Sequence, residues 1–181
     1  MTGQRLVAVR HGAVVVPAGW CYGQSDVPLV RTPEQDAAEV IARLDGWRPE
    51  IIATSPWLRT APVAQLLGEY FGVVVRVDSR LSELAFGAFE NRAYAAIERE
   101  DPEAYQVWMG NWETIGPPGG ESANALRWRV AAWHSEWRAS AAGTLVMTHA
   151  GAVRALRVIA RGITMAEAFA DPVEHLRPEV F

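Results

Sequence analysis

The chain has 181 residues, half of them hydrophobic, which suits one domain with a sizeable core. Its net charge of −4 argues against nucleic acid as a partner, and no apolar stretch is long enough to span a membrane. All 17 basic residues are arginines, which excludes Schiff-base, pyridoxal phosphate and P-loop lysine chemistry.

The single cysteine, Cys21, excludes an intrachain disulfide and is consistent with a reducing compartment. The first five residues lead directly into an apolar run, which leaves no room for a signal peptide. Cysteine and histidine nowhere show the spacing of zinc ligands. We therefore expect a cytoplasmic protein with no metal, no cofactor and no membrane partner.

The apolar run Leu6–Val9 predicts a buried strand that ends at Arg10, His11 and Gly12. Such a strand brings a cation and an imidazole to the edge of the sheet where α/β proteins bind ligands. Glycine allows a ligand to approach the backbone closely. A tripeptide of this kind on its own is more often a surface or packing feature than a site.

Apolar residues at helical spacing predict a helix over 34–44, followed by a strand over 51–54. A second helix is expected over 57–70, with Arg59 near its start and Gly72 after its end.

The run 73–77 predicts another strand, and Glu83 follows it closely. Residues 86–121 interrupt the alternation of strands and helices, and we expect them to form a lid or a substrate wall. The alternative is that Trp108 and Trp112 complete a small separate core.

A long helix is expected over 122–142 with Ser122 as its N-cap, and the run 144–148 predicts a strand that ends at His149. Helical spacing resumes at 153–159. This alternation predicts a single α/β domain, residues 1–181, as a three-layer αβα sandwich with a mostly parallel sheet.

Six blocks of this sequence, in the same order, resemble the histidine phosphatase superfamily, which has the phosphoglycerate-mutase-like fold. They are Arg10-His11-Gly12 and Thr148-His149-Ala150-Gly151, with residues 22–29, 55–59, 83–90 and 118–122 between them. The stretch 21–29 is similar, more narrowly, to the branch that includes α-ribazole phosphatases of cobalamin assembly.

The resemblance implies a metal-independent phosphomonoesterase that forms a phosphohistidine. His11 would be the nucleophile, and Arg10 and Arg59 would hold the phosphoryl group, which suits planar, permanently charged guanidinium forks. His149 would bind the transferring oxygens. Glu83 would protonate the leaving oxygen and then take a proton from water.

Four further residues are expected to contact phosphate or substrate: Gly12, Tyr22, Gly23 and Ala150. Glu121 would either contact substrate or only favour the start of the following helix, and the sequence leaves both options open.

His134 is expected at the surface and His175 in solvent. Two departures from the family pattern, Ala13–Pro17 and Val63, remove polar side chains that many relatives carry. They imply fewer side-chain donors on one wall of the phosphate pocket.

The expected partner is a small phosphorylated metabolite, with α-ribazole 5′-phosphate as one candidate. Two alternatives remain: a phosphoglycerate mutase-type phosphoryl transferase, and a non-catalytic member of the fold that binds a phosphorylated ligand. The oligomeric state stays open, with a homodimer as one option.

Overall fold

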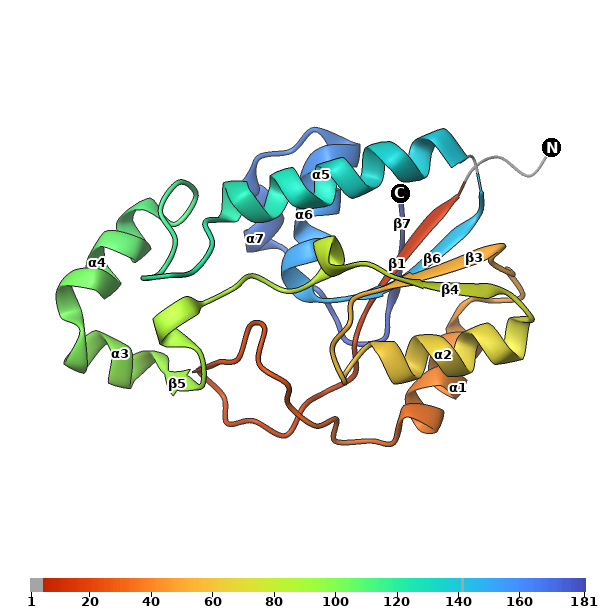
Figure 1. Cartoon of the computed structure of the whole chain (residues 1–181), viewed down its shortest axis with the longest axis horizontal. Coiled ribbons are helices and arrows are strands. Elements are labelled where there is room, and N and C mark those ends of the chain that lie inside the picture. Colours follow the sequence, from red (N-terminus) through yellow and green to blue (C-terminus); the bar gives the residue numbers. More distant parts are fainter. Residues whose placement is uncertain (1–4, 141) are drawn as a thin grey trace.

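The computed structural model describes residues 5–140 and 142–181. Its central sheet has the strand order β4-β3-β6-β1-β7 (Figure 1). The strands are β1 (Leu6–Arg10), β3 (Ile51–Thr54), β4 (Val74–Val77), β6 (Thr144–Thr148) and β7 (Pro178–Val180). The first four run parallel to one another, and β7 runs antiparallel to β1. The prediction of a mostly parallel sheet is therefore confirmed.

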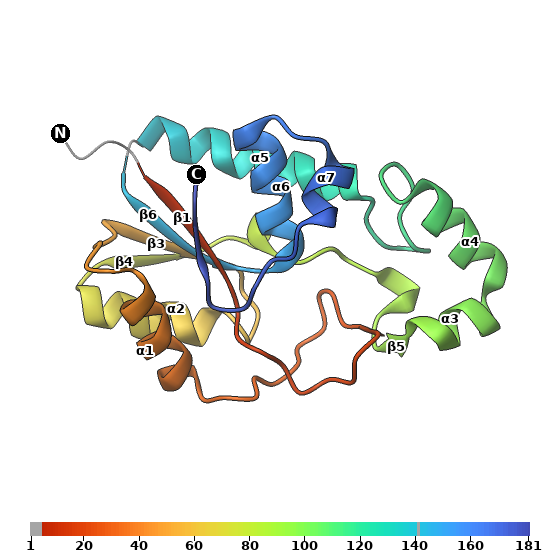
Figure 2. The same cartoon turned by 180° about the vertical axis from the view of Figure 1, so that it is seen from behind.

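Helices cover both faces of this sheet and make the three-layer sandwich that the sequence predicts. α1 (Pro33–Arg43) and α2 (Ala61–Phe71) pack on one face, and α5 (Ala123–Ser140) and α6 (Ala150–Arg161) on the other (Figures 1 and 2). Alternate residues of β1 enter the two cores: Val7 and Val9 face α1 and α2, whereas Leu6 and Ala8 face α5 and α6. The period of two in a strand produces this division.

Local signals explain where the helices begin. Thr32 and Gln35 form a capping box at the start of α1. The expectation that α2 begins at residue 57 is wrong, because Pro62 has no N–H and is tolerated only in the first helical turn. The helix therefore starts at Ala61, and residues 56–60 form a turn.

Residues 86–121 project away from the sheet and carry η2 (Gly87–Phe89), β5 (Arg92–Ala93), α3 (Tyr94–Glu100) and α4 (Pro102–Asn111) (Figure 1). β5 pairs with β2 (Trp20–Cys21). Trp108 lies in a small core with Cys21, Phe89 and Ile97. The alternative that this tryptophan completes a separate core is thus confirmed for Trp108.

Trp112 packs against the same small core and also contacts Phe169 of α7 (Met165–Ala170), with 4.7 Å between the ring centroids. This contact joins the inserted segment to the main domain.

His134 is 7% exposed, so the expectation of a surface residue is wrong. Its ring lies 5.2 Å from that of Trp137, on the side of α5 that packs toward the sheet. Within the described residues, no helix has the length and apolar character needed to cross a bilayer.

Candidate active site

The site forms where β1 and β6 end side by side. The backbone N–H of His11 donates to the carbonyl of Thr148 at 2.9 Å, which places the residues after the two strands next to each other. The rings of His11 and His149 consequently lie 5.2 Å apart, centroid to centroid. The structure thus brings together the two histidines that lie 138 positions apart in the chain (149 − 11).

His11 is held in the form that a nucleophile needs. Its Nδ1 lies 2.7 Å from the carbonyl of Gly12, which can only accept, so Nδ1 carries the proton and Nε2 keeps a free lone pair. Burial lowers the pKa of His11 well below its usual range, and the Arg59 guanidinium lowers it further. The imidazole is therefore neutral at physiological pH.

His149 has both ring nitrogens occupied. Nδ1 accepts from Arg59 Nε at 3.2 Å, so Nε2 carries the proton and donates to Ser55 Oγ at 2.7 Å. Ser55 in turn lies 2.6 Å from Thr60 Oγ1. In this arrangement His149 orients Arg59. Direct contact with the transferring oxygens stays a prediction, since it requires the ring to release Arg59 or Ser55.

Arg59 is fully buried and fixed from several sides. Besides its bond to His149, it donates to the carbonyl of Ser25 at 2.7 Å and to that of Gly23. The ring of Tyr22 lies 5.3 Å from its Cζ. Tyr22 and Gly23, predicted as substrate contacts, therefore also act as supports for a cation beside His11.

Arg10 lines the pocket from the end of β1. One guanidinium nitrogen donates to the carbonyl of Val173 at 2.7 Å, whereas its buried Nε has no hydrogen-bond partner among the described residues. A buried donor without a partner is costly unless a ligand satisfies it.

The carboxylate of Glu83 sits at the first turn of α6. Its Oε1 accepts from the backbone N–H of Leu84 at 2.8 Å and from that of Gly151 at 3.0 Å. A Cβ at position 151 would overlap this oxygen, so the glycine is needed for the approach of the carboxylate. The structure therefore brings Glu83 to the start of α6, directly after His149, as the predicted acid role requires.

The sequence gives no sign of the residue that supports the Glu83 segment. Arg129 of α5 donates to the carbonyls of Arg80, Ser82 and Glu83 at 2.7, 2.8 and 2.9 Å. Its guanidinium also binds both carboxylate oxygens of Glu121, at 2.7 and 2.8 Å.

Glu121 does not line the catalytic pocket. Its other contact is with the backbone N–H of Ala85 at 3.2 Å, so the structure places it in this support and not with the other predicted site residues.

His175 is a further residue of the site that the sequence did not predict. The expectation that it lies in solvent is wrong. Its Nδ1 donates to the carbonyl of His11 at 2.6 Å, and the two rings lie 5.6 Å apart. The segment reaches this position because the backbone N–H of Leu176 donates to the carbonyl of Arg10 at 2.9 Å.

The catalytic pocket encloses about 200 Å³. Among the predicted site residues, those that line it are Arg10, Tyr22, Gly23, Glu83 and Ala150. Arg154 of α6 also lines it, and no sequence signal singled this residue out. His11, Arg59 and His149 are not in its lining and are buried, with 0–1% of their surfaces exposed.

An apolar groove of about 410 Å³ adjoins this pocket. The two share Leu84, Phe86, Tyr94 and Phe169, and the groove continues to Trp108, Met109 and Trp112. Residues of the inserted segment thus line both hollows.

Gly12 contributes through packing. The buried carboxylate of Asp36 occupies the space that a Cβ at position 12 would need. The two departures from the family pattern lie away from the pocket lining. Val63 is buried in the core between α1, α2 and the sheet, and the Ala13–Pro17 loop is bonded to residues 28–30.

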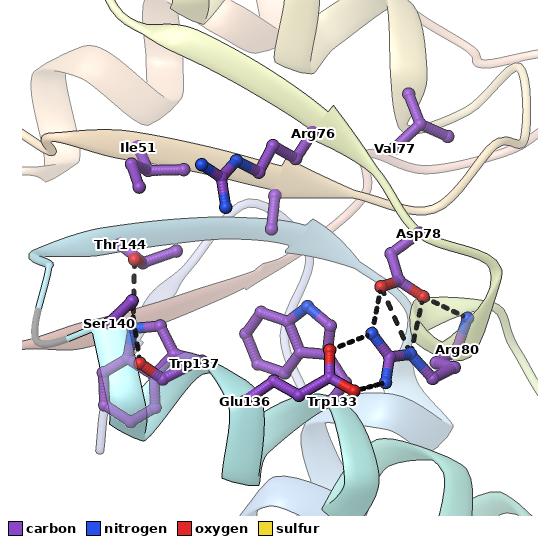
Figure 3. A pocket seen from close by; sticks show the side chains of 11 residues that line it. Ile51, Arg76, Val77, Asp78, Arg80, Trp133, Glu136, Trp137, Ser140 and Thr144 are labelled. Carbon is purple, nitrogen blue, oxygen red and sulfur yellow. Dashed lines mark hydrogen bonds and ion pairs between the residues drawn. The ribbon is translucent and has the colours of Figure 1, made fainter.

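A second hollow, of about 440 Å³, lies between the sheet and α5 (Figure 3). Arg80 crosses one side of it and binds both Asp78 and Glu136 at 2.7 Å. Arg76 also lines the hollow, so its lining carries two positive and two negative side chains. None of the predicted site residues lies there, and the hollow adds nothing to the catalytic chemistry.

A neutral, buried histidine thus lies beside two guanidinium groups at the carboxyl ends of parallel strands, the arrangement expected from the family resemblance. The chain belongs to the histidine phosphatase superfamily (branch 1), whose model matches residues 6–176.

Among curated proteins, glucosyl-3-phosphoglycerate phosphatase of Mycobacterium tuberculosis is 37% identical over 67% of this chain and 55% of its own length. The adenosylcobalamin/α-ribazole phosphatase of Escherichia coli is 30% identical over 70% of this chain and 63% of its own. A probable phosphoglycerate mutase of Salmonella paratyphi C is 35% identical over 71% and 60%. The chain thus spans between about half and two thirds of these relatives.

Solved structures match over nearly the whole chain. A putative α-ribazole-5′-P phosphatase from Escherichia coli has a TM-score of 0.89 at 23% identity, covering 99% of this chain and 90% of its own. At that identity the likeness establishes the fold alone. The mycobacterial glucosyl-3-phosphoglycerate phosphatase has a TM-score of 0.82 at 28% identity, covering 98% and 88%.

Proposed function

We propose that the protein is a metal-independent phosphomonoesterase that acts on a small phosphorylated metabolite through a phosphohistidine. The observation that carries the proposal is the free Nε2 of a neutral His11, fixed by the bond from Nδ1 to Gly12 and flanked by cations. Two of the relatives are named as phosphatases, each for a different substrate, and they support the same reaction, hydrolysis of a phosphomonoester.

In the first step, Nε2 of His11 attacks phosphorus and the bond from phosphorus to the ester oxygen breaks. Glu83 gives its proton to the departing oxygen, so an alcohol leaves. The dianion of a bound phosphomonoester favours the protonated form of a neighbouring carboxyl group. Arg10 and Arg59 neutralise the charge on the phosphoryl oxygens.

In the second step, Glu83 takes a proton from water, whose oxygen attacks phosphorus. The phosphorus–nitrogen bond breaks, inorganic phosphate leaves and neutral His11 returns. Gly151 holds the Glu83 carboxylate beside the pocket through both steps.

One candidate substrate is α-ribazole 5′-phosphate. Two observations support it: residues 21–29 resemble the α-ribazole phosphatase branch, and one relative is an adenosylcobalamin/α-ribazole phosphatase. A mutase must keep water from the phosphohistidine until product is phosphorylated. Two of the relatives are named as phosphatases and one as a probable mutase, which supports hydrolysis over transfer. We also propose that the enzyme acts in the cytoplasm, which fits a free, buried Cys21.

His11→Ala tests the proposal. The wild type, incubated with labelled substrate and quenched in alkaline detergent, should carry acid-labile, base-stable phosphate on His11, and the variant should carry none and hydrolyse nothing. Assays with an aryl phosphate and with phosphoglycerate separate hydrolysis from mutase activity. A phosphoenzyme labelled at another residue would refute the assignment.

A further inference from the structure

Arg154 is an arginine of the catalytic pocket that the phosphoryl chemistry above does not use. It lies on α6 three residues after Gly151, whose N–H holds Glu83. Side chains of a helix lean toward its N-terminus, so the long arm of Arg154 extends back over the first turn. That direction explains why the residue lines the pocket together with Glu83 and Ala150.

The guanidinium of Arg154 has an incomplete set of partners. Its Nε is buried without a hydrogen-bond partner among the described residues. Its Cζ lies 4.5 Å from the centroid of the Phe169 ring. Arg10, Arg59 and Arg129, by contrast, each donate to at least one backbone carbonyl. Phe169 covers one face of the guanidinium and leaves its planar N–H edge for an acceptor.

The charged groups at the pocket leave an excess of positive charge during the reaction. The Asp171 carboxylate also acts on Arg154, but it lies outside the pocket lining and is paired with Arg157 at 3.2 Å. Arg10, Arg59 and Arg154 carry one positive charge each, and burial keeps His11 and His149 neutral. A phosphomonoester supplies close to two negative charges. Glu83 is protonated when it acts as the acid, so about one positive charge remains.

We propose that Arg154 binds a carboxylate on the alcohol part of the substrate, on the side of the ester oxygen that Glu83 protonates. The inference rests on the proposed function and assigns it a specificity residue. A carboxylate matches the planar edge of the guanidinium with two parallel hydrogen bonds, which a hydroxyl group cannot do.

Two pairs of substrates isolate this contact: phosphoglycolate against 2-hydroxyethyl phosphate, and 3-phosphoglycerate against glycerol 3-phosphate. Within each pair, a hydroxymethyl group replaces the carboxylate. The wild type should prefer the carboxylate member of at least one pair. Arg154→Met should lower kcat/KM for that member by roughly 10- to 100-fold, the scale of a hydrogen bond to a charged group. The hydroxymethyl member should change by less than about threefold, within the ordinary scatter of a surface substitution.

Arg161→Met is the matched control. Arg161 lies on the same helix and also stacks on an aromatic ring, that of Phe181 at 5.1 Å, but it lies outside the catalytic pocket. This variant should leave both members of each pair unchanged. Arg154→Lys keeps the charge without the fork and should recover only part of the preference; it also replaces the Met variant if thermal melting shows that the latter does not fold.

Equal losses on both members of a pair would overturn the inference, because they would place Arg154 on the phosphoryl group or in a structural role. The absence of any preference in the wild type would overturn it as well. Calorimetric binding of the same pairs to His11→Ala, with and without Arg154→Met, separates this inference from the proposed function. If no monoester is hydrolysed, the proposed function fails, whereas a carboxylate preference in binding that disappears with Arg154→Met still supports the Arg154 site.

Discussion

Glu83→Gln is the substitution that separates chemistry from structure most sharply in this site. Glu83 is held by two backbone donors, the N–H groups of Leu84 at 2.8 Å and Gly151 at 3.0 Å. Both bonds end on Oε1, and the amide oxygen of glutamine can accept both in the same place. The Gly151 N–H also lies 3.2 Å from Oε2, where glutamine would place its NH2 group. The variant therefore keeps the two shorter bonds and loses this longer contact, the charge and the ability to exchange a proton.

The expected magnitudes differ enough to be told apart. Exchanging a charged acceptor for a neutral one in these bonds should cost roughly 1–2 kcal/mol of the free energy of unfolding. Loss of general acid–base catalysis should lower kcat about 100- to 10,000-fold on alkyl phosphates, whose alkoxides leave poorly. Nitrophenyl phosphate should lose much less in phosphoryl transfer, because its phenolate leaves without a proton.

The assay is rapid-mixing release of nitrophenolate by the Gln variant. Glutamine cannot deprotonate water, so the phosphohistidine should accumulate and produce a burst of about one equivalent of product. Glu121→Gln is the matched control. Because Glu121 is bound to Arg129 and lies outside the pocket lining, its loss should slow alkyl and aryl phosphates alike and produce no burst.

Equal slowing of both substrates by Glu83→Gln, with no burst, would refute the acid–base assignment. The same pattern together with a much lower melting temperature would show that Glu83 only supports the segment between β4 and η2.

Arg59→Lys should cost roughly 2–4 kcal/mol of transition-state binding, because an ammonium group cannot keep the bonds to His149, Ser25 and Gly23 together; kcat/KM within a few-fold of the wild type would count against this. Activity should survive EDTA, since guanidinium groups supply the positive charge, and inhibition that magnesium or zinc reverses would contradict it. Stability should fall as the pH drops below about 6.5, because burial lowers the pKa of all four histidines and the unfolded chain then takes up protons that the folded chain does not. Denaturant titration should show a loss of up to about 1.4 kcal/mol per pH unit for each such histidine, and equal stability at pH 7.5 and 5.5 would refute the linkage.

The sheet and its main helices were predictable because they depend on local patterns. The apolar runs of β1, β3 and β6 and the helical spacing around Val40 and Leu67 are visible in any short window of sequence. The meeting of His11, Arg59, Glu83 and His149 followed from the rule that parallel strands end at one edge, together with the family resemblance.

The supports of the site could not be predicted, since each depends on contacts between distant segments. Arg129 looks like any polar residue of an amphipathic helix until α5 is placed against residues 80–83. Pairing of β7 with β1 brings His175 next to His11, and no periodicity reveals it. The burial of His134 could not be predicted either, because a helix face that carries both histidine and tryptophan shows no clear apolar stripe.

The contacts of Arg10 and His11 with residues 173–176 determine when this site can form during synthesis. His11 directly follows β1, yet its carbonyl and that of Arg10 are bound by His175 and Leu176, more than 160 positions later (175 − 11 = 164). The site is therefore complete only after residues 173–176 have been made. Such distant contacts slow folding, because a long loop must close before they form. A nascent chain that stops before residue 173 would contain every residue assigned to the chemistry and still lack the segment that holds the nucleophile in place.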